Sequence, residues 1–208
     1  MPNKTFYILF VLLLFSCNKK ETLKISVKNV VTGEPVAGNH ISIVEIFNVS
    51  DGVSGSKTKQ FYSGQTNSEG VLFVTEKFNK NRRYEIFVGK FPEKHCYLNS
   101  MGHTWYVGAN TEINFEYAPC AYLKLKIENV DCIDANDQIF YRRQWLHGEN
   151  YSNGVTQYGC FYFDGDYFSV PMGSHRYEWI VTKNGVSLNY DTTFYISEGG
   201  AYDMVIEY

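Results

Sequence analysis

The sequence predicts an all-β protein, with two tandem β-sandwich domains following a short N-terminal leader. Aromatic residues make up 17% of the chain, and the 17 tyrosines and 15 phenylalanines favour strands over helices. Apolar and polar residues alternate over short runs, and few stretches show a helical period. Glycine, asparagine and serine separate these runs at short intervals, as turns between strands require.

The N-terminal residues predict export. Lys4 supplies a weakly positive start, and Phe6 to Phe15 is an unbroken apolar run of signal-peptide length, too short to span a bilayer. The stretch Leu14-Phe15-Ser16-Cys17 resembles the lipobox of bacterial lipoproteins. The alternative is an ordinary secretory leader that contains a cysteine by chance.

The lipobox resemblance implies that Cys17 receives a diacylglyceryl group, that the leader is cut before it, and that the new amine is acylated, commonly with palmitate. A thiol is needed as the nucleophile, and a small residue before it suits a narrow peptidase pocket. Three acyl chains, at roughly 0.8 kcal/mol per buried methylene, make a lasting membrane anchor. We therefore assign 1–16 to the signal peptide and 17–21 to the lipidated cysteine and a short tether.

The residue after Cys17 bears on location. Asn18 is not the aspartate associated with inner-membrane retention in some bacteria, which favours the outer membrane. Whether the protein faces the periplasm or the exterior stays open. Because the tether is short, the first domain is expected close to the lipid surface.

The first domain begins with a half-buried strand, since Leu23, Ile25 and Val27 alternate with polar residues. Two turn motifs follow, Thr32-Gly33-x-Pro35-Val36-x-Gly38 and Gly64-x-Thr66-x-x-x-Gly70. Further strands are expected at 41–47, 71–74, 83–88, 105–107 and 112–117.

With its two turn motifs, the segment 22–118 resembles the carboxypeptidase-regulatory-like, transthyretin-like β-sandwich domains of exported bacterial proteins. That family consists mostly of accessory, stalk-like or binding modules. The resemblance therefore implies a non-catalytic domain, and it brings no catalytic residues to this chain.

The second half repeats parts of the first in the same order. The pattern at 23–30 recurs at 123–130, that at 83–90 recurs at 176–183, and the pair Glu-Tyr ends each half. We therefore predict a divergent second sandwich, transthyretin-like or immunoglobulin-like, over 119–208, although it lacks both turn motifs.

The repeat also assigns faces and turns in the second sandwich. Three inward positions of the first half match three of the second, so all six are expected in the cores: Tyr84, Ile86, Val88, Tyr177, Trp179 and Val181. Asn184-Gly185 and Asp164-Gly165-Asp166 are both expected to be hairpin turns.

With Cys17 assigned to lipid, four cysteines remain, and an exported chain meets an oxidising compartment that favours disulfides. Of the three pairings, we favour Cys132 with Cys160, both in the second half, and Cys96 with Cys120. Each loop of this size adds roughly 3–4 kcal/mol of stability by the chain-entropy argument.

Metal binding is weakly signalled. A site from His95, Cys96, His103 and Cys120 is an alternative to the disulfides, but the spacing resembles no zinc signature.

Calcium binding at Asp131, Asp134 and Asp137 would suit their oxygen donors, yet the twelfth position from Asp134 is Trp145 rather than glutamate. A solvated turn is expected there, and no metal or cofactor is predicted.

Charge and motifs exclude several function classes. The net charge of −3 and pI near 6.0 argue against a nucleic-acid partner. No Gly-x-Ser-x-Gly nucleophile elbow occurs. The scattered histidines form no catalytic or metal-binding motif and are expected in surface or turn positions: His40, His95, His103, His147 and His175.

Aromatic residues crowd one part of the second half: Tyr141, Trp145, Tyr151, Tyr158, Phe161, Tyr162, Phe163, Tyr167 and Phe168. Alternation along one strand puts Tyr158, Cys160 and Tyr162 on one face and Phe161 and Phe163 on the other. A sandwich has one interior, so one set is expected to be exposed unless loops or the first domain cover it.

Exposed aromatics of this kind stack on sugar rings or anchor a protein partner. Trp145, Tyr141 and Tyr151 are the candidate ligand-binding residues. The sequence thus favours a non-enzymatic, lipid-anchored binding or scaffolding protein of the outer membrane or cell surface. The alternatives are a glycan-binding surface lipoprotein and a hydrolase whose site is assembled from separate loops.

Overall fold

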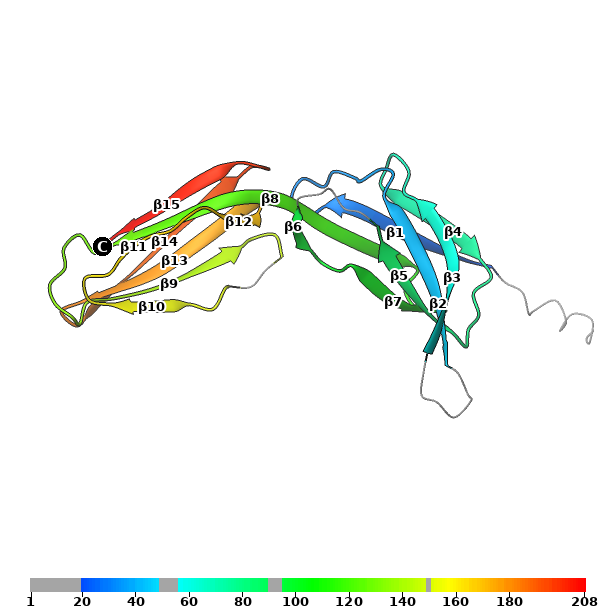
Figure 1. The fold of residues 1–208 in the computed structure, drawn as a ribbon, viewed down its shortest axis with the longest axis horizontal. Helices are drawn as coiled ribbons and strands as arrows, with labels where there is room; N and C mark the ends of the chain where they lie inside the picture. The colour runs from blue at the N-terminus through cyan, green and yellow to red at the C-terminus, as the bar shows by residue number, and fades with distance from the viewer. Residues whose placement is uncertain (1–19, 49–55, 90–94, 149–150) are drawn as a thin grey trace, which may run out of the picture. The chain divides into compact units, whose positions relative to one another are not determined.

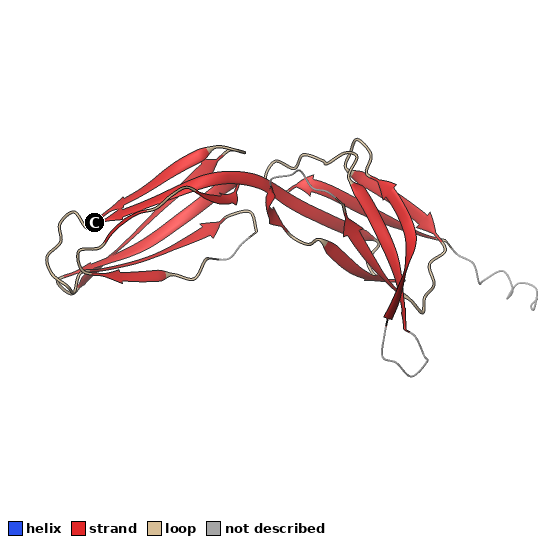
Figure 2. Cartoon of the chain, in the orientation of Figure 1, coloured by secondary structure: helices blue, strands red, loops and turns tan. Residues whose placement is uncertain are grey.

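The computed structural model describes residues 20–48, 56–89, 95–148 and 151–208. Over these ranges the protein is all-β, with fifteen strands and no helix (Figure 1 and Figure 2). No helix in this part of the chain is long and apolar enough to cross a membrane. The predicted leader and lipobox, Cys17 included, lie outside the described residues.

The chain divides into two compact units. Unit 1 comprises 1–28, 35–90 and 100–115, and unit 2 comprises 29–34, 91–99 and 116–208. One long strand, β8 (Glu112–Glu128), begins in unit 1 and continues in unit 2. The units differ from the predicted ranges 22–118 and 119–208 because 29–34 and 91–99 of the first half are grouped with unit 2.

Unit 1 is a sandwich of two sheets. In the first sheet, β1 lies between β4 and the start of β8; the bounds are β1 (Glu21–Asn29) and β4 (Val71–Glu76). The second sheet has the order β3-β2-β5-β7, with bounds β3 (Ser56–Gln65), β2 (His40–Asn48), β5 (Arg83–Val88) and β7 (Gly102–Tyr106). Alternate residues of these strands fill the core, among them Leu23, Ile25, Ile43, Tyr84, Ile86 and Trp105.

The two turn motifs of the first half pack against each other. The buried Thr66 hydroxyl donates to the Val36 carbonyl at 2.6 Å and accepts from the Asn39 amide at 2.9 Å. Gly70 has φ +68°, and a Cβ there would lie 2.6 Å from the Val27 carbonyl oxygen. Any side chain at this position would therefore displace the first strand.

Unit 2 is also a sandwich. Its first sheet contains the second part of β8, with β15 (Ala201–Glu207) on one side and three short strands paired elsewhere along β8: β6 (His95–Leu98), β11 (Tyr162–Asp164) and β12 (Phe168–Pro171). The second sheet has the order β10-β9-β13-β14, with bounds β10 (Val155–Tyr158), β9 (Gln138–Trp145), β13 (Gly173–Lys183) and β14 (Val186–Ile196).

The predicted repeat has a structural counterpart in each unit. In unit 1 the last strand runs beside the first in the same direction, since Lys24 pairs with Glu112 and Ser26 with Asn114. In unit 2 the last strand, β15, likewise pairs in parallel with the first, β8. The repeated segments at β5 and β13 both lie second from the edge of their sheets.

Five of the six residues predicted to point inward are buried, and the sixth, Trp179, is only partly buried. The histidine prediction is wrong for His175, which is fully buried and hydrogen-bonds through Nε2 to the Pro171 carbonyl at 2.9 Å. His175 alternates with Tyr177 along β13 and so shares its inward face.

One predicted hairpin turn is absent. Asp164-Gly165-Asp166 does not reverse the chain, because β11 and β12 both pair with β8 in the same direction. The Gly165 amide donates to the Leu125 carbonyl at 3.1 Å. These residues therefore interrupt one extended segment that runs antiparallel to β8 as β11 and then β12. The other predicted turn, Asn184-Gly185, does join β13 to β14, and both residues have positive φ.

The four described cysteines form two pairs at disulfide distance. Cys96 bonds to Cys120 with an S–S distance of 2.01 Å, and Cys132 bonds to Cys160 at 1.91 Å. This is the pairing favoured from the sequence. Both bonds lie within unit 2.

Candidate binding cleft

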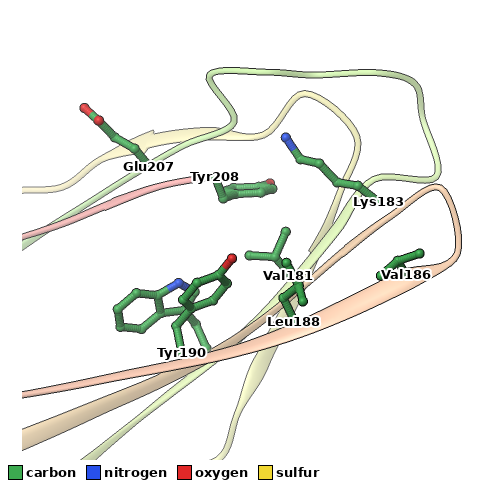
Figure 3. A pocket seen from close by; sticks show the side chains of 8 residues that line it. Val181, Lys183, Val186, Leu188, Tyr190, Glu207 and Tyr208 are labelled. Atoms are coloured by element: carbon green, nitrogen blue, oxygen red, sulfur yellow. The ribbon is translucent and has the colours of Figure 1, made fainter.

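Unit 2 contains an apolar cavity of about 300 Å³ at the end of the sandwich where β13 turns into β14 (Figure 3). Six of its lining residues come from the β13–β14 hairpin and two from the end of the chain. The lining residues are Trp179, Val181, Lys183, Val186, Leu188, Tyr190, Glu207 and Tyr208.

Strand register explains why these side chains meet. Trp179 lies opposite Tyr190, and Val181 lies opposite Leu188, so the four side chains share one face of the hairpin. This is the face that carries buried Tyr177 farther along β13. The cavity is therefore an extension of the sandwich core beyond the region that the opposing sheet covers.

The β14 side of this face is open to solvent. Val186, Leu188 and Tyr190 are 63%, 54% and 45% exposed, whereas Phe194 and Ile196 on the same face of the strand are buried. Among the strands of the described chain, β14 is paired only with β13 and forms an edge of its sheet. An exposed edge with apolar side chains is a surface that another chain can cover.

Three aromatic side chains form a row across the sheet. Tyr141 on β9 lies opposite Trp179 on β13, and Trp179 lies opposite Tyr190 on β14. The Trp179 and Tyr190 rings stack, with centroids 5.7 Å apart and planes 16° apart. Tyr141 and Trp179 both pack against the core, and Trp179 and Tyr190 line the cavity.

Lys183 closes one end of the cavity. Its Nζ donates to the Asn129 side-chain oxygen at 2.9 Å and to the Asp131 carbonyl at 2.8 Å, and it lies 5.3 Å from the centre of the Tyr208 ring. Burial raises the pKa of Tyr208, with a smaller contribution from Asp137. The Tyr208 hydroxyl is buried and has no hydrogen-bond partner among the described residues.

The side chains around this cavity are mostly apolar and aromatic. The lining consists of aromatic side chains, the aliphatic side chains of Val181, Val186 and Leu188, one ammonium group and one carboxylate. An apolar site with a few polar groups at its margins fits a ligand that is itself largely apolar.

The structure does not bring the three predicted ligand-binding residues together. The prediction is wrong for Trp145, which is fully buried and donates through Nε1 to the Met172 carbonyl at 2.8 Å. A ring in the core cannot stack on a ligand. Tyr141 is partly buried on the inward face of its sheet, next to the cavity but outside its lining.

Tyr151, the third candidate, lies on the opposite face of the same sheet. Its ring covers the Arg142 guanidinium at 4.0 Å, and its hydroxyl donates to Glu178. Arg142 also donates to Glu178, at 2.7 Å. The hydrogen bond from Tyr151 and the two from Arg142 hold the pKa of the Glu178 carboxyl below its usual range. Tyr151 thus belongs to a charged surface network.

The predicted alternation from Tyr158 to Phe163 also fails. Tyr158 ends β10 in one sheet, and Tyr162 begins β11 in the other, so no single strand carries them both. Gly159, with φ +70°, lies at the crossing between the sheets. Tyr158 and Tyr162 of one predicted set and Phe163 of the other are exposed, whereas Phe161 is partly buried, so exposure does not follow the two sets.

Neither metal alternative has a counterpart in the described residues. Cys96 and Cys120 are bonded to each other and so cannot act as thiolate ligands. Asp137 is buried and accepts hydrogen bonds from the Ile133 amide and the Asn129 side chain, which lower the pKa of its carboxyl. No group of three or more potential ligands gathers in the part of the chain that the structure describes.

Sequence reasoning missed Leu188, Tyr190 and the partial exposure of Trp179. The alternation Val186-x-Leu188-x-Tyr190 marks one apolar face of a strand. It does not reveal whether the opposing sheet reaches far enough to cover that face, which depends on tertiary packing.

Comparison with known proteins yields distant likenesses only. No protein-family model matches the chain, and no curated protein matches it significantly. Among solved structures, the Bacillus anthracis TIE protein is 16% identical with a TM-score of 0.36, over 91% of this chain. This chain spans about a third (34%) of that protein's length.

Two pilins match similarly. The shaft pilin SpaA from Lactobacillus rhamnosus GG is 10% identical with a TM-score of 0.34, over 91% of this chain and 98% of its own. The minor pilin GBS52 of Streptococcus agalactiae is 14% identical with a TM-score of 0.30, over 90% and 94%. At these scores the likenesses carry no conclusion about what this chain does.

Proposed function

We propose that this protein is a lipid-anchored envelope protein of the outer membrane or cell surface that binds a protein partner and catalyses no reaction. The lipobox-like stretch Leu14-Phe15-Ser16-Cys17 supports the anchor. The observation that carries the binding role is the uncovered apolar edge of unit 2, where β14 exposes Val186, Leu188 and Tyr190 beside the cavity.

The mode of binding that fits this edge is strand addition. The free edge of β14 offers main-chain donors and acceptors to an extended segment of another protein, and the cavity receives its alternate apolar side chains. Main-chain hydrogen bonds then provide affinity, and the cavity provides selectivity. The resemblance of the first half to accessory and stalk-like modules agrees with such a role.

Site-specific photo-crosslinking in intact cells tests the binding role. A photoreactive phenylalanine analogue replaces Leu188 in one variant and Phe73 in the matched control; Phe73 is a large exposed residue on β4 of unit 1. We expect a discrete adduct of one protein from position 188 and none from position 73. Equal adducts from both positions, or none from position 188, would reject the binding edge.

Metabolic labelling tests the anchor separately. Growth with an alkyne-bearing palmitate analogue should label the protein and place it in the membrane fraction, and Cys17→Ser should abolish both. Labelling that survives Cys17→Ser would contradict lipidation at this residue.

Glycan binding is the second candidate function, favoured by the exposed Tyr190 ring and the partly buried Trp179 ring beside two charged groups, Lys183 and Glu207. Aromatic faces of this kind stack on sugar rings. A glycan array probed with the protein and with Tyr190→Ala separates the two candidates. Retention lost in the variant supports glycan recognition, and retention on no glycan excludes it.

A further inference from the structure

Unit 1 has a second cavity of a different chemical character. It measures about 530 Å³ and lies at the end of the sheet formed by β3, β2, β5 and β7, beside the loop that leads into β5. Its lining combines three cations with apolar and aromatic side chains: Ile46, Phe47, Lys80, Arg82, Arg83 and Tyr106, together with Asn81.

The cations are only partly neutralised. Arg82 lies 3.6 Å from Glu45, and Arg83 lies 3.5 Å from Glu85, both long for ion pairs. The Arg83 Nε is buried and has no hydrogen-bond partner among the described residues. Lys80 is exposed, and no partner is found for it in the same part of the chain. The cavity therefore has unused donors for an anion.

Apolar surface lies directly beside these donors. Ile46 is buried at the cavity wall, the Phe47 ring lies 5.2 Å from the Arg82 guanidinium carbon, and Tyr106 is 56% exposed. Register places Ile46 and Tyr106 on either side of Arg83. A free inorganic anion would leave this apolar surface unused, whereas an amphiphile with an anionic headgroup would cover it.

The cavity lies beside the loop that follows β4, and the end of β4 is paired with the start of β1. Glu21 at the start of β1 pairs with Glu76 at the end of β4, and the loop bearing Lys80 follows immediately. Cys17 precedes Glu21 by four residues, a reach of about 14 Å at most. A lipid on Cys17 would thus hold this end of unit 1 within reach of the headgroup layer, where surface potentials act.

The two units also differ in net charge, and the basic unit is the one that carries this cavity. In the described residues of unit 1, lysine and arginine outnumber aspartate and glutamate, and the reverse holds in unit 2. The net charge of −3 for the whole chain conceals this difference. A basic unit beside an acyl anchor adds electrostatic attraction to anionic lipids, which orients this unit toward the membrane.

We propose that the cavity bounded by Lys80, Arg82 and Arg83 binds the phosphate group of an anionic phospholipid headgroup in the membrane that holds the anchor. This inference rests on the proposed lipid anchor for its location. The guanidinium and ammonium groups pair with the phosphate oxygens, and Phe47, Ile46 and Tyr106 contact the glycerol and upper acyl region.

Vesicle co-sedimentation tests the proposal without the anchor. The protein is residues 18–208, which contain every described strand, and the vesicles are phosphatidylcholine alone or with phosphatidylglycerol. We expect binding only to the vesicles with phosphatidylglycerol, weakening as salt rises. Each cation near an anionic surface contributes about fivefold to binding, so Lys80→Gln/Arg82→Gln/Arg83→Gln should reduce it on the order of 100-fold.

A matched variant removes the same charge from unit 2. Lys124→Gln/Lys126→Gln/Arg176→Gln should bind vesicles as strongly as the parent, provided that circular dichroism shows both variants folded. Equal losses in the two variants would overturn the proposal, since net charge alone would then explain binding. If a thermal melt shows the unit 1 variant unfolded, Lys80→Gln alone replaces it, because Lys80 is exposed; this variant should reduce binding about fivefold, and unchanged binding would overturn the proposal.

Soluble phosphate distinguishes the source of the ligand. Millimolar glycerol 3-phosphate should not release the protein from the vesicles; release at that concentration would overturn the lipid assignment in favour of a soluble ligand. Failure of palmitate labelling at Cys17 with intact vesicle binding would reject the anchor alone. Intact labelling without vesicle binding would reject the cavity alone.

Discussion

Trp179 on β13 stacks on Tyr190 of the neighbouring strand β14, with ring centroids 5.7 Å apart and planes 16° apart. The two residues are cross-strand partners in the register of the hairpin. Both rings keep part of their surface open to solvent, since Tyr190 is exposed and Trp179 is only partly buried. The stack therefore stabilises the pairing of β14 with β13 where the opposing sheet does not cover β14. It also leaves part of both rings accessible to a ligand.

A double-mutant cycle measures this stack. Trp179→Leu, Tyr190→Leu and the double variant should give a coupling free energy of about 0.5–1.5 kcal/mol in urea unfolding, the range for aromatic pairs. Ile180 and Asn189 are cross-strand partners on the opposite face of the same hairpin and provide the control cycle. A coupling for Trp179 and Tyr190 no larger than that of the control pair would show that the stack contributes no specific stability.

The two tryptophans of unit 2 should differ in what their truncation costs. Trp145→Ala should lower the free energy of unfolding by about 3–5 kcal/mol, because its ring is fully buried and its Nε1 is hydrogen-bonded. Trp179→Ala should cost about 1–2 kcal/mol, because part of its ring is already in water. Urea titrations followed by circular dichroism would compare them, and equal costs would contradict the assignment of Trp179 to a cleft.

Local pattern predicted several strands of the first half and the faces of some of them. Leu23, Ile25 and Val27 alternate with polar residues and are all buried, as period-two alternation requires in a sandwich. The repeat between the halves assigned inward faces to β5 and β13, and five of the six residues so assigned are buried. These features depend on neighbours in the chain, which the sequence displays directly.

The candidate cleft depends on contacts between distant residues, and there the prediction from the sequence failed. Trp145 belongs to an aromatic-rich stretch, but its place opposite His175 in the sheet directs its ring into the core. Gly159 follows the last residue of β10 and precedes β11, which belongs to the other sheet. The alternation of side chains along β10 therefore does not continue into β11. The exposure of Leu188 follows from how far the opposing sheet extends, which no local pattern records.

The two disulfides should stabilise unit 2 by similar amounts. They close loops of similar length, with sequence separations of 24 and 28 residues, so removing either one should cost about 3 kcal/mol by the chain-entropy argument. Cys132→Ala/Cys160→Ala and Cys96→Ala/Cys120→Ala would each be compared with the parent in thermal melts. Cys17→Ser, which removes a cysteine outside both pairs, is the control and should leave the melting temperature unchanged.

His175 should make the protein less stable in mild acid. Its ring is fully buried between β13 and its neighbours and stacks on Phe194 at 5.8 Å. Burial lowers the pKa of His175 from 6.5 to about 4, with small further lowering by Arg143 and His147, and the hydrogen bond to the Pro171 carbonyl opposes the shift. The Nδ1 atom is buried without a partner among the described residues, so a second proton would have no acceptor there.

The sign of the effect follows from proton uptake. Between pH 6.5 and about 4 the unfolded chain binds a proton at His175 that the folded protein does not, so the free energy of unfolding falls as pH falls through this window. The full loss is on the order of 3 kcal/mol. His175→Phe keeps an aromatic ring against Phe194 and should flatten the dependence of melting temperature on pH between 7 and 4.5. His103→Gln, an exposed position on β7, should leave that dependence unchanged. An unaltered slope in His175→Phe would assign the acid sensitivity to other groups.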